Sequence, residues 1–213
     1  MTQDPDWKTW RRQRRRELID ARRSLAPADR AARNTAIDGL LEAGFAPVGG
    51  STVGFCWPFA GEPEPRFAVR RWRVAGSRAC LPVVVAPRQP LEFREWWPGA
   101  PMATGVYDIP HPAGTELLAP DVCLVPVNGF DAAGYRLGYG GGFFDRTLAA
   151  MPWKPLCVGL GYEIARLSTI HPQPHDVPFD FMVTEAGIFE RRDASLLPIT
   201  AADAGDRVRQ RLA

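Results

Sequence analysis

Three continuous apolar segments most restrict the fold that this chain can adopt. They cover residues 79–86 (ACLPVVVA), 122–127 (VCLVPV) and 156–162 (LCVGLGY). A strand with one solvent-exposed face alternates apolar and polar residues, whereas an unbroken apolar run is typical of a strand buried on both faces. Such strands need helices on both sides of their sheet. The segments therefore predict an α/β fold with three helix–sheet–helix layers and a mostly parallel central sheet.

The residues between these segments fit the same layering. Helices are predicted at about 5–25, at 29–41 with Gly44 ending the helix, at 65–75 and at 143–151, and further strands at 52–57, 91–96 and 181–184. Residues 97–120 are rich in Pro and Gly, and we expect a long loop there, which is uncommon without a functional reason. The 213 residues suggest one domain over 1–192. Residues 193–213 form a polar tail, either a short helix or a mobile end.

The net charge of +2 gives no argument for a nucleic acid or a membrane as partner. No apolar run approaches the roughly 20 residues of a membrane-spanning helix, and the arginine-rich start lacks the apolar core of a secretory signal. Cys56, Cys80, Cys123 and Cys157 lie in apolar, strand-like segments without a C-x-x-C pair. We interpret them as small buried hydrophobic residues in a reducing compartment and expect a cytoplasmic protein.

The histidines give no metal signature. His171 and His175 are separated by a segment with two prolines, so they cannot share a helix face as zinc ligands would, and His111 lies in the predicted loop. A zinc site is therefore not expected.

The segment RLGYGGGFFDR (residues 136–146) follows a predicted buried strand and leads into a predicted helix. Backbone N–H groups at a helix start lack partners within the helix, and glycines let an anion approach them closely. Arg136 and Arg146 would add charge-assisted hydrogen bonds to a phosphate. Asp145 would repel a bare phosphate, but it suits Mg²⁺ held between carboxylate and phosphate. The pattern predicts a nucleoside triphosphate with magnesium.

The segment also allows a purely structural interpretation, and it differs from several known motifs. Its glycines could serve tight packing alone, with Asp145 as a favourable residue in the first helical turn. The segment lacks the G-K-[ST] of a P-loop, and Phe143 stands where a dinucleotide fingerprint requires its last glycine. The chain also lacks a G-x-S-x-G elbow, which argues against a serine hydrolase.

Residues 125–149, VPVNGFDAAGYRLGYGGGFFDRTLA, resemble the signature of the 5-formyltetrahydrofolate cyclo-ligase family, also called 5,10-methenyltetrahydrofolate synthetases. Three other segments agree in order: RRRELIDARRSLAP with the basic first helix of the family, FCWPFAGEPEPR with a strand and turn, and HPQPHDVPFDFMVTEAGIF with the closing segment. The resemblance covers nearly the whole chain up to about residue 192.

The resemblance implies an enzyme that converts 5-formyltetrahydrofolate to 5,10-methenyltetrahydrofolate. It implies ATP as co-substrate and Mg²⁺ as cofactor, with release of ADP and phosphate through a phosphorylated formyl intermediate. The expected partners are therefore 5-formyltetrahydrofolate and ATP. We expect a monomer that binds neither nucleic acid nor membrane.

The resemblance also implies particular ATP-binding residues. Two are Arg11 and Arg15 of the first helix, although Lys8, one turn before Arg11, is an alternative for the first of them. The others form the glycine segment: Arg136, Leu137, Gly138, Tyr139, Gly140, Gly141, Gly142, Phe143 and Phe144. Gly141 departs from the family pattern, because many members carry a lysine there.

For the metal, the resemblance implies Asp145 and Asp180, with Asp176 as the alternative second ligand. For the folate, it implies Glu62, whose carboxylate suits the aminopyrimidine-like edge of a pterin, and Trp57, whose flat ring suits a flat ligand. Without the resemblance, Glu62 would be interpreted as a solvated loop acid and Trp57 equally as a core residue. Tyr139 and Phe143 are expected to place the glycine segment against the substrate.

Parts of the sequence are compatible with three other functions. The arginine-rich start could bind nucleic acid, which a steep salt dependence would reveal. A sugar-phosphate isomerase or a CoA transferase could share a layered α/β fold. A relative of the family could also bind folate or ATP without turnover, although Arg136, Asp145 and Glu62 are all present.

Overall fold

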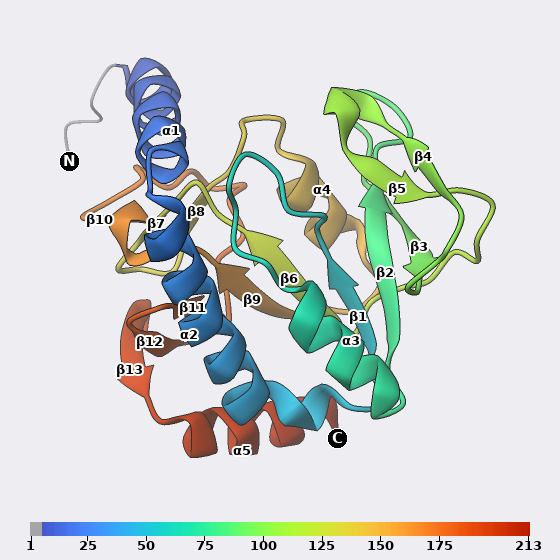
Figure 1. The fold of residues 1–213 in the computed structure, drawn as a ribbon. Coiled ribbons are helices and arrows are strands. Elements are labelled where there is room, and N and C mark those ends of the chain that lie inside the picture. Colours follow the sequence, from blue (N-terminus) through green and yellow to red (C-terminus); the bar gives the residue numbers. More distant parts are fainter. Residues whose placement is uncertain (1–5) are drawn as a thin grey trace.

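The central feature of the computed structural model, which describes residues 6–213, is an eight-stranded sheet (Figure 1). The pairings from β11 through β9, β6 and β1 to β2 are parallel, and those at both edges are antiparallel. The mostly parallel sheet predicted from the apolar segments is therefore confirmed. In spatial order the strands are β13 (Ser195–Ile199), β12 (Gly187–Arg192), β11 (Phe181–Thr184), β9 (Leu156–Leu160), β6 (Val122–Pro126), β1 (Thr52–Phe55), β2 (Arg78–Val83) and β3 (Glu92–Trp96).

Helices cover both faces of this sheet, as the three-layer prediction requires. One core cluster joins Leu41, Trp72 and Val208 to the first face, and a second cluster joins Leu148 to the other. These residues belong to α2, α3 and α5 on the first face and to α4 on the second. The helices are α1 (Trp7–Arg23), α2 (Pro27–Phe45), α3 (Arg66–Val74), α4 (Phe143–Ala150) and α5 (Ala201–Leu212). None of the helices within residues 6–213 is long and apolar enough to cross a membrane.

Gly44 does not end the second helix as predicted, because α2 continues to Phe45. A Cβ atom at Gly44 would lie 2.5 Å from the Cδ1 atom of Ile188 on β12. The glycine therefore allows the helix to pack closely on the sheet. A short 3₁₀ segment, Ala46–Val48, follows directly.

Residues 97–120 are not the continuous loop that their composition predicted. They contain a small hairpin of β4 (Met102–Thr104) and β5 (Pro110–Pro112), seen in green beside β2 and β3 in Figure 1. Its turn includes the 3₁₀ segment Val106–Asp108, where Tyr107 and Asp108 have φ angles of 62° and 57°. Strands this short carry too few residues to show a periodicity, so the Pro and Gly content dominated the prediction.

Residues 193–213 belong to the fold and are not a mobile tail. β13 pairs with β12 at the edge of the large sheet, and α5 packs against α2. Ala204 and Val208 on α5 are fully buried. Of the two alternatives for this segment, the helix is the correct one, and it completes one of the helical layers.

The buried cysteines lie on neighbouring central strands. Cys123 on β6 pairs in register with Cys157 on β9, and Cys80 on β2 is buried as well. Burial raises the pKa of all three thiols above the ordinary value, which keeps them protonated and unreactive. These three act as small core residues, as predicted, whereas Cys56, which was also predicted to be buried, is only partly buried.

The strand order changes direction at β1. The chain passes from β1 to β2 on one side and later returns to β6 on the other. In open α/β sheets such a switch point leaves a crevice at the carboxyl ends of the strands, where ligands bind. A small three-stranded sheet of β10 (Arg166–Leu167), β7 (Gly129–Asp131) and β8 (Arg136–Leu137) follows β6 and carries the chain into the glycine segment.

Candidate active site

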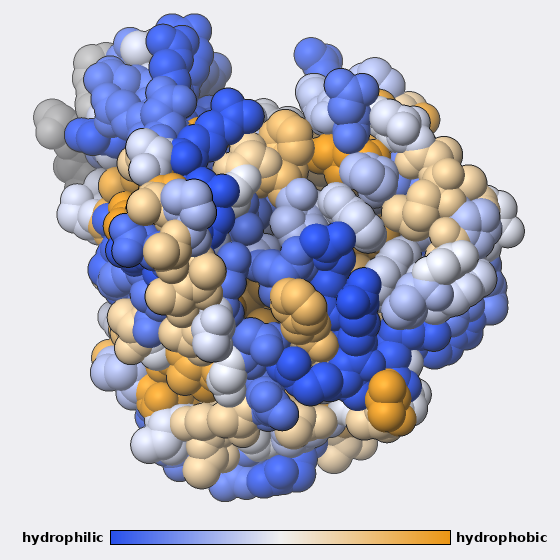
Figure 2. All heavy atoms as spheres, in the orientation of Figure 1, coloured by the Kyte–Doolittle hydropathy of each residue, from blue (hydrophilic) through white to orange (hydrophobic). Residues whose placement is uncertain are grey.

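A cavity of about 1010 Å³ opens at the carboxyl ends of β1, β2 and β6. Cys56, Val84 and Pro126, at or just beyond the ends of these strands, contribute to its lining. Helix α1 and the β4–β5 hairpin supply further lining residues, and Figure 2 shows a hollow between these two parts of the surface. The cavity therefore lies at the switch point of the sheet.

Most residues singled out in the sequence line this one cavity, although they come from distant parts of the chain. Two do not. Leu137 is buried within β8 and is absent from the lining, and Asp180 lies elsewhere, as described below. The residues brought together are Arg11, Arg15, Trp57, Glu62, Arg136, Gly138, Tyr139, Gly140, Gly141, Gly142, Phe143, Phe144 and Asp145.

The glycine segment turns sharply before α4. Gly140 and Gly142 have φ angles of 97° and 64°, a region that residues with a side chain adopt at a cost, and Gly142 is the N-cap of α4. Arg146 donates from Nη2 to the carbonyl of Gly141 at 2.6 Å. Its Nε is buried and has no hydrogen-bond partner among the described residues. A buried donor without a partner beside free helix-start N–H groups is a suitable site for an anion.

Two arginines of α1 line the cavity. Arg15 donates from Nε to the carbonyl of Gly138 at 2.7 Å, and Arg11 lines the same cavity. Burial and the charge of Arg11 lower the pKa of Arg15. Asp176 offsets part of this repulsion, and an anion bound beside Arg15 would offset more of it. Lys8, the alternative to Arg11, does not line the cavity and lies 5.5 Å from the ring of Trp7.

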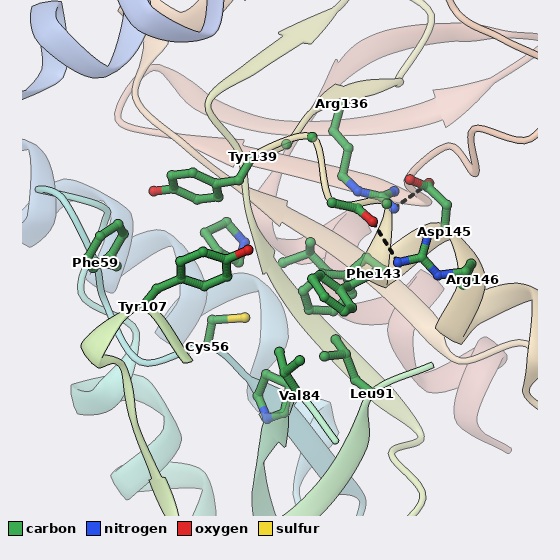
Figure 3. Close-up of a pocket in the computed structure, with 18 of the residues that line it drawn as sticks. Cys56, Phe59, Val84, Leu91, Tyr107, Arg136, Tyr139, Phe143, Asp145 and Arg146 are labelled. Carbon is green, nitrogen blue, oxygen red and sulfur yellow. Dashed lines mark hydrogen bonds and ion pairs between the residues drawn. The ribbon is translucent and has the colours of Figure 1, made fainter. Parts of the chain in front are cut away.

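Two aspartates lie next to each other on this side of the cavity. Asp145 accepts hydrogen bonds at Oδ1 from Arg136 at 2.5 Å and from the backbone N–H of Val177 at 3.1 Å (Figure 3). Asp176 directly precedes Val177, lines the cavity and pairs with Arg11 at 2.5 Å. Both aspartates therefore lie on the same wall of the cavity, each paired with an arginine.

Asp180 does not belong to this pair, which corrects the prediction that it joins Asp145. Its carboxylate accepts from the backbone N–H of Cys157 at 2.9 Å and from Lys154 at 3.0 Å, and Arg211 of α5 lies 3.3 Å away. Asp180 directly precedes β11, so it lies at the amino edge of the parallel strands, opposite the cavity. Asp176, four residues earlier, is the aspartate that lines the cavity together with Asp145.

The chemistry of the two cavity acids fits a magnesium ion. Residues 6–213 contain no group of three or more His, Cys, Asp or Glu side chains arranged as a metal site. Mg²⁺ does not require one, because it commonly takes one or two carboxylates and completes its shell with phosphate oxygens and water. Asp145 and Asp176 supply carboxylates in the cavity that the glycine segment also lines.

Glu62 lies on the opposite side of the cavity in a buried position. Its side chain is only 5% exposed, and it accepts from the hydroxyl of Tyr139 at 2.7 Å and from the backbone N–H of Phe59 at 3.0 Å. Burial raises the pKa of Glu62, and the contacts with Tyr139, Arg22 and Phe59 partly offset that rise. The alternative of a solvated loop acid is therefore wrong.

Trp57 both packs against its neighbours and borders the cavity. Its ring packs against Trp96 with centroids 6.4 Å apart, and the guanidinium of Arg66 lies 4.4 Å from its centre. It also lines the cavity. Packing that holds an aromatic ring still is compatible with stacking of a flat ligand on the ring.

Two residues, one beside the cavity and one lining it, were not predicted from the sequence. Arg22 is buried and bonded to Tyr139, but nothing distinguished it from the other arginines of the first helix. Tyr107 is 67% exposed on the hairpin and points its ring toward the cavity (Figure 3). No sequence signal for Tyr107 existed, because its segment was predicted to be a loop.

The fold and the site together define a layered α/β protein with a large cavity at its switch point. One side of this cavity suits an anion with a divalent cation, and the other presents a buried acid beside aromatic rings. This combination is typical of an enzyme that brings two different substrates together.

Comparisons with known proteins identify the family. The model of the 5-formyltetrahydrofolate cyclo-ligase family matches residues 7–185. The 5-formyltetrahydrofolate cyclo-ligase of Mycolicibacterium smegmatis is 30% identical over 180 residues, which cover 81% of this chain and 92% of the relative. That of Haemophilus influenzae is 30% identical over 139 residues, covering 62% and 74%. The chain belongs to the 5-formyltetrahydrofolate cyclo-ligase family.

A solved structure agrees with this result at the level of the fold. The NMR structure of Aquifex aeolicus 5,10-methenyltetrahydrofolate synthetase is similar with a TM-score of 0.74 and 24% sequence identity, and the match covers 89% of this chain and 96% of that one. The cavity described above therefore lies in a fold that this synthetase shares.

Proposed function

We propose that the protein converts 5-formyltetrahydrofolate to 5,10-methenyltetrahydrofolate, with ATP as co-substrate and Mg²⁺ as cofactor. The observation that carries this proposal is that the glycine segment and Glu62 line one and the same cavity. A reaction between a nucleotide and a folate requires both binding regions to face one space. Membership of the cyclo-ligase family supplies the choice of substrate.

The proposed chemistry solves a leaving-group problem. The formyl oxygen is amide-like and leaves poorly, whereas phosphate leaves readily. The formyl oxygen attacks the terminal phosphorus of ATP, which releases ADP and gives a phosphorylated formyl group. N10 of the folate then attacks the formyl carbon. The C–O bond breaks, phosphate departs and N10 loses its proton. The residues contribute mainly positioning and charge neutralisation, as in other phosphoryl transfers.

The polyphosphate of ATP is assigned to the glycine segment and the arginines around it. Backbone N–H groups between Gly138 and Gly142 can bond phosphate oxygens without obstruction by side chains. Among the described residues, the two Nη groups of Arg15 make no hydrogen bond, since its one bond uses Nε. Arg146 contributes the unpartnered Nε beside the same loop. These donors match the charge and the size of a polyphosphate.

Asp145 and Asp176 would hold the magnesium ion, which when bound neutralises part of the phosphate charge. The ion pairs with Arg136 and Arg11 keep these two carboxylates in place. Asp145 receives additional support from the backbone N–H of Val177. The acids are therefore already oriented before a ligand arrives, which lowers the cost of ordering them on binding.

The folate is assigned to the side of the cavity that carries Glu62. A carboxylate accepts hydrogen bonds from the N–H groups along the aminopyrimidine edge of a pterin, and its burial makes these bonds stronger than they would be in water. Trp57 offers a flat face for the ring. Tyr139 and Phe143 belong to the glycine segment and also line the cavity, so they adjoin both substrates.

The direct test uses purified protein, 5-formyltetrahydrofolate, ATP and Mg²⁺, and follows the near-ultraviolet absorbance of methenyltetrahydrofolate. We expect product with the complete mixture, and none when ATP is omitted or the metal is chelated. One phosphate should be released for each product molecule. Product formation that is unchanged after removal of ATP or Mg²⁺ would refute the proposed chemistry.

We further expect a monomer in the cytoplasm that acts without nucleic acid or membrane. Sedimentation of the purified protein tests the first point, and a stable dimer at micromolar concentration would contradict it. An oligonucleotide titration at low and high salt tests the partner prediction, because a steep salt dependence would favour nucleic-acid binding through α1.

A further inference from the structure

Arg22 is a buried charge with no role in the proposed reaction so far. It lies in the last turn of α1 and is only 4% exposed. Its Nε donates to the carbonyl of Ala60 at 3.0 Å, its Nη1 to the carbonyl of Val127 at 3.3 Å and its Nη2 to the hydroxyl of Tyr139 at 2.9 Å. One guanidinium thus joins the turn that carries Glu62, the end of β6 and the glycine segment.

The hydroxyl of Tyr139 extends these contacts to the buried acid. It accepts a hydrogen bond from Arg22 and donates one to Oε1 of Glu62 at 2.7 Å. Arg22 and Glu62 are therefore opposite charges joined through one hydroxyl. Charge-assisted hydrogen bonds arranged in a chain strengthen one another in a desolvated site. The planar fork of arginine can reach three diverging acceptors, which a single ammonium group cannot do with the same geometry.

We propose that Arg22 is a positioning residue that fixes Tyr139 against Glu62 and thereby holds the folate-binding acid and the ATP-binding loop in one relative orientation. This inference rests on the proposed function, because the orientation of Glu62 matters only if the substrate ring binds there. Arg22 itself is absent from the cavity lining, so it acts through Tyr139 and Glu62.

The electrostatic surroundings of Glu62 give this role a measurable signature. The groups that influence its titration are Tyr139, Arg22 and the backbone N–H of Phe59, and Cys56 lies close enough for its own pKa to be raised by Glu62. Burial raises the pKa of Glu62, and Arg22 opposes that rise. Without the positive charge, Glu62 would take up a proton at a higher pH and lose its capacity to accept from the folate.

The test compares Arg22→Met, Arg22→Lys and Arg23→Met, where the exposed neighbour Arg23 provides the matched control. The assay measures kcat and KM for 5-formyltetrahydrofolate and for ATP over a range of pH. For Arg22→Met we expect KM for the folate to rise about tenfold, the loss from one charge-assisted hydrogen-bond network. The acid limb of its kcat/KM profile should also move to higher pH.

The other two variants separate charge from geometry. Arg22→Lys keeps the positive charge, so its acid limb should stay near that of the wild type while KM for the folate rises. Arg23→Met should leave the kinetic constants and the pH profile unchanged. Equal losses for both substrates in Arg22→Met, with an unmoved acid limb, would mean that Arg22 only supports the fold and would overturn the proposal.

If Arg22→Met does not fold, Tyr139→Phe tests the same link from its other end. This variant removes the bridging hydroxyl and leaves α1 intact. It should raise KM for the folate and move the acid limb upward, and an unchanged profile would overturn the proposal. In the double variant of Tyr139→Phe and Arg22→Lys, KM for the folate should rise little more than in the more affected single variant. Both changes break the same chain of hydrogen bonds. An inactive wild type would instead refute the proposed function, which keeps the two failures distinguishable.

Discussion

Replacement of Glu62 by glutamine should separate the folding of this protein from its activity. The side chain is 5% exposed, and burial is the main cause of its raised pKa. A raised pKa means that the folded protein binds the proton more tightly than the unfolded chain does. The folding free energy from this group is therefore most favourable at low pH and is lost as pH rises through the folded pKa. Glu62→Gln removes the buried charge but also one acceptor, since Oε2 accepts from the backbone N–H of Phe59, so the variant should fold at neutral pH with a stability close to that of the wild type.

Catalysis should respond in the opposite direction. Glutamine keeps an oxygen to accept from the hydroxyl of Tyr139, so the contact with the glycine segment survives. It loses the negative charge offered to the folate. A hydrogen bond to a charged group contributes about 1.5–3 kcal/mol more than no bond at all. Because about 1.4 kcal/mol corresponds to a factor of ten, kcat/KM for 5-formyltetrahydrofolate should fall about 10- to 150-fold.

The measurement pairs thermal unfolding at several pH values with the absorbance assay for methenyltetrahydrofolate. Glu64→Gln is the matched control, because Glu64 lies on the same turn, pairs with Arg66 and does not line the cavity. It should retain wild-type activity. A Glu62→Gln variant with full activity would refute folate binding by Glu62. A variant that is markedly less stable at neutral pH would refute the argument from burial.

Three further predictions follow from the same contacts. Asp145→Asn keeps both hydrogen bonds, which use Oδ1, and should fold normally, but its activity at limiting Mg²⁺ should drop about 100-fold or more; near-normal activity there would contradict the metal assignment. Asp176→Asn should raise the Mg²⁺ concentration needed for half-maximal activity, whereas Asp180→Asn should change thermal stability and not this concentration, and the reverse result would restore Asp180 as the ligand. Val208→Ala should lower the free energy of unfolding by about 2 kcal/mol in denaturant titrations, while the exposed Arg209→Ala should not, and an unaffected Val208→Ala would show that α5 does not contribute to the core.

The central strands were predictable because the sequence pattern that identifies them is local. A continuous apolar segment such as residues 122–127 predicts burial on both faces, and β6 is found there. The edge elements lacked such a pattern. β4 and β5 have three residues each, and β13 has only one buried residue, so none of them shows a clear alternation. Their pairing depends on neighbours that are distant in sequence, so composition suggested a loop and a tail.

The sequence by itself determined the layered α/β class, the glycine segment before α4, and the set of acids and arginines from which a site could be built. The tertiary structure decided which of them meet. Asp176 and Asp180 are four residues apart, yet only Asp176 lines the cavity. Residues 177–180 carry the chain from the cavity to the start of β11, so Asp180 lies at the opposite, amino edge of the parallel strands. Arg22 was one arginine among many until folding placed it between Ala60, Val127 and Tyr139. Side-chain identity is a local property, whereas burial and partnership arise only when distant segments pack together.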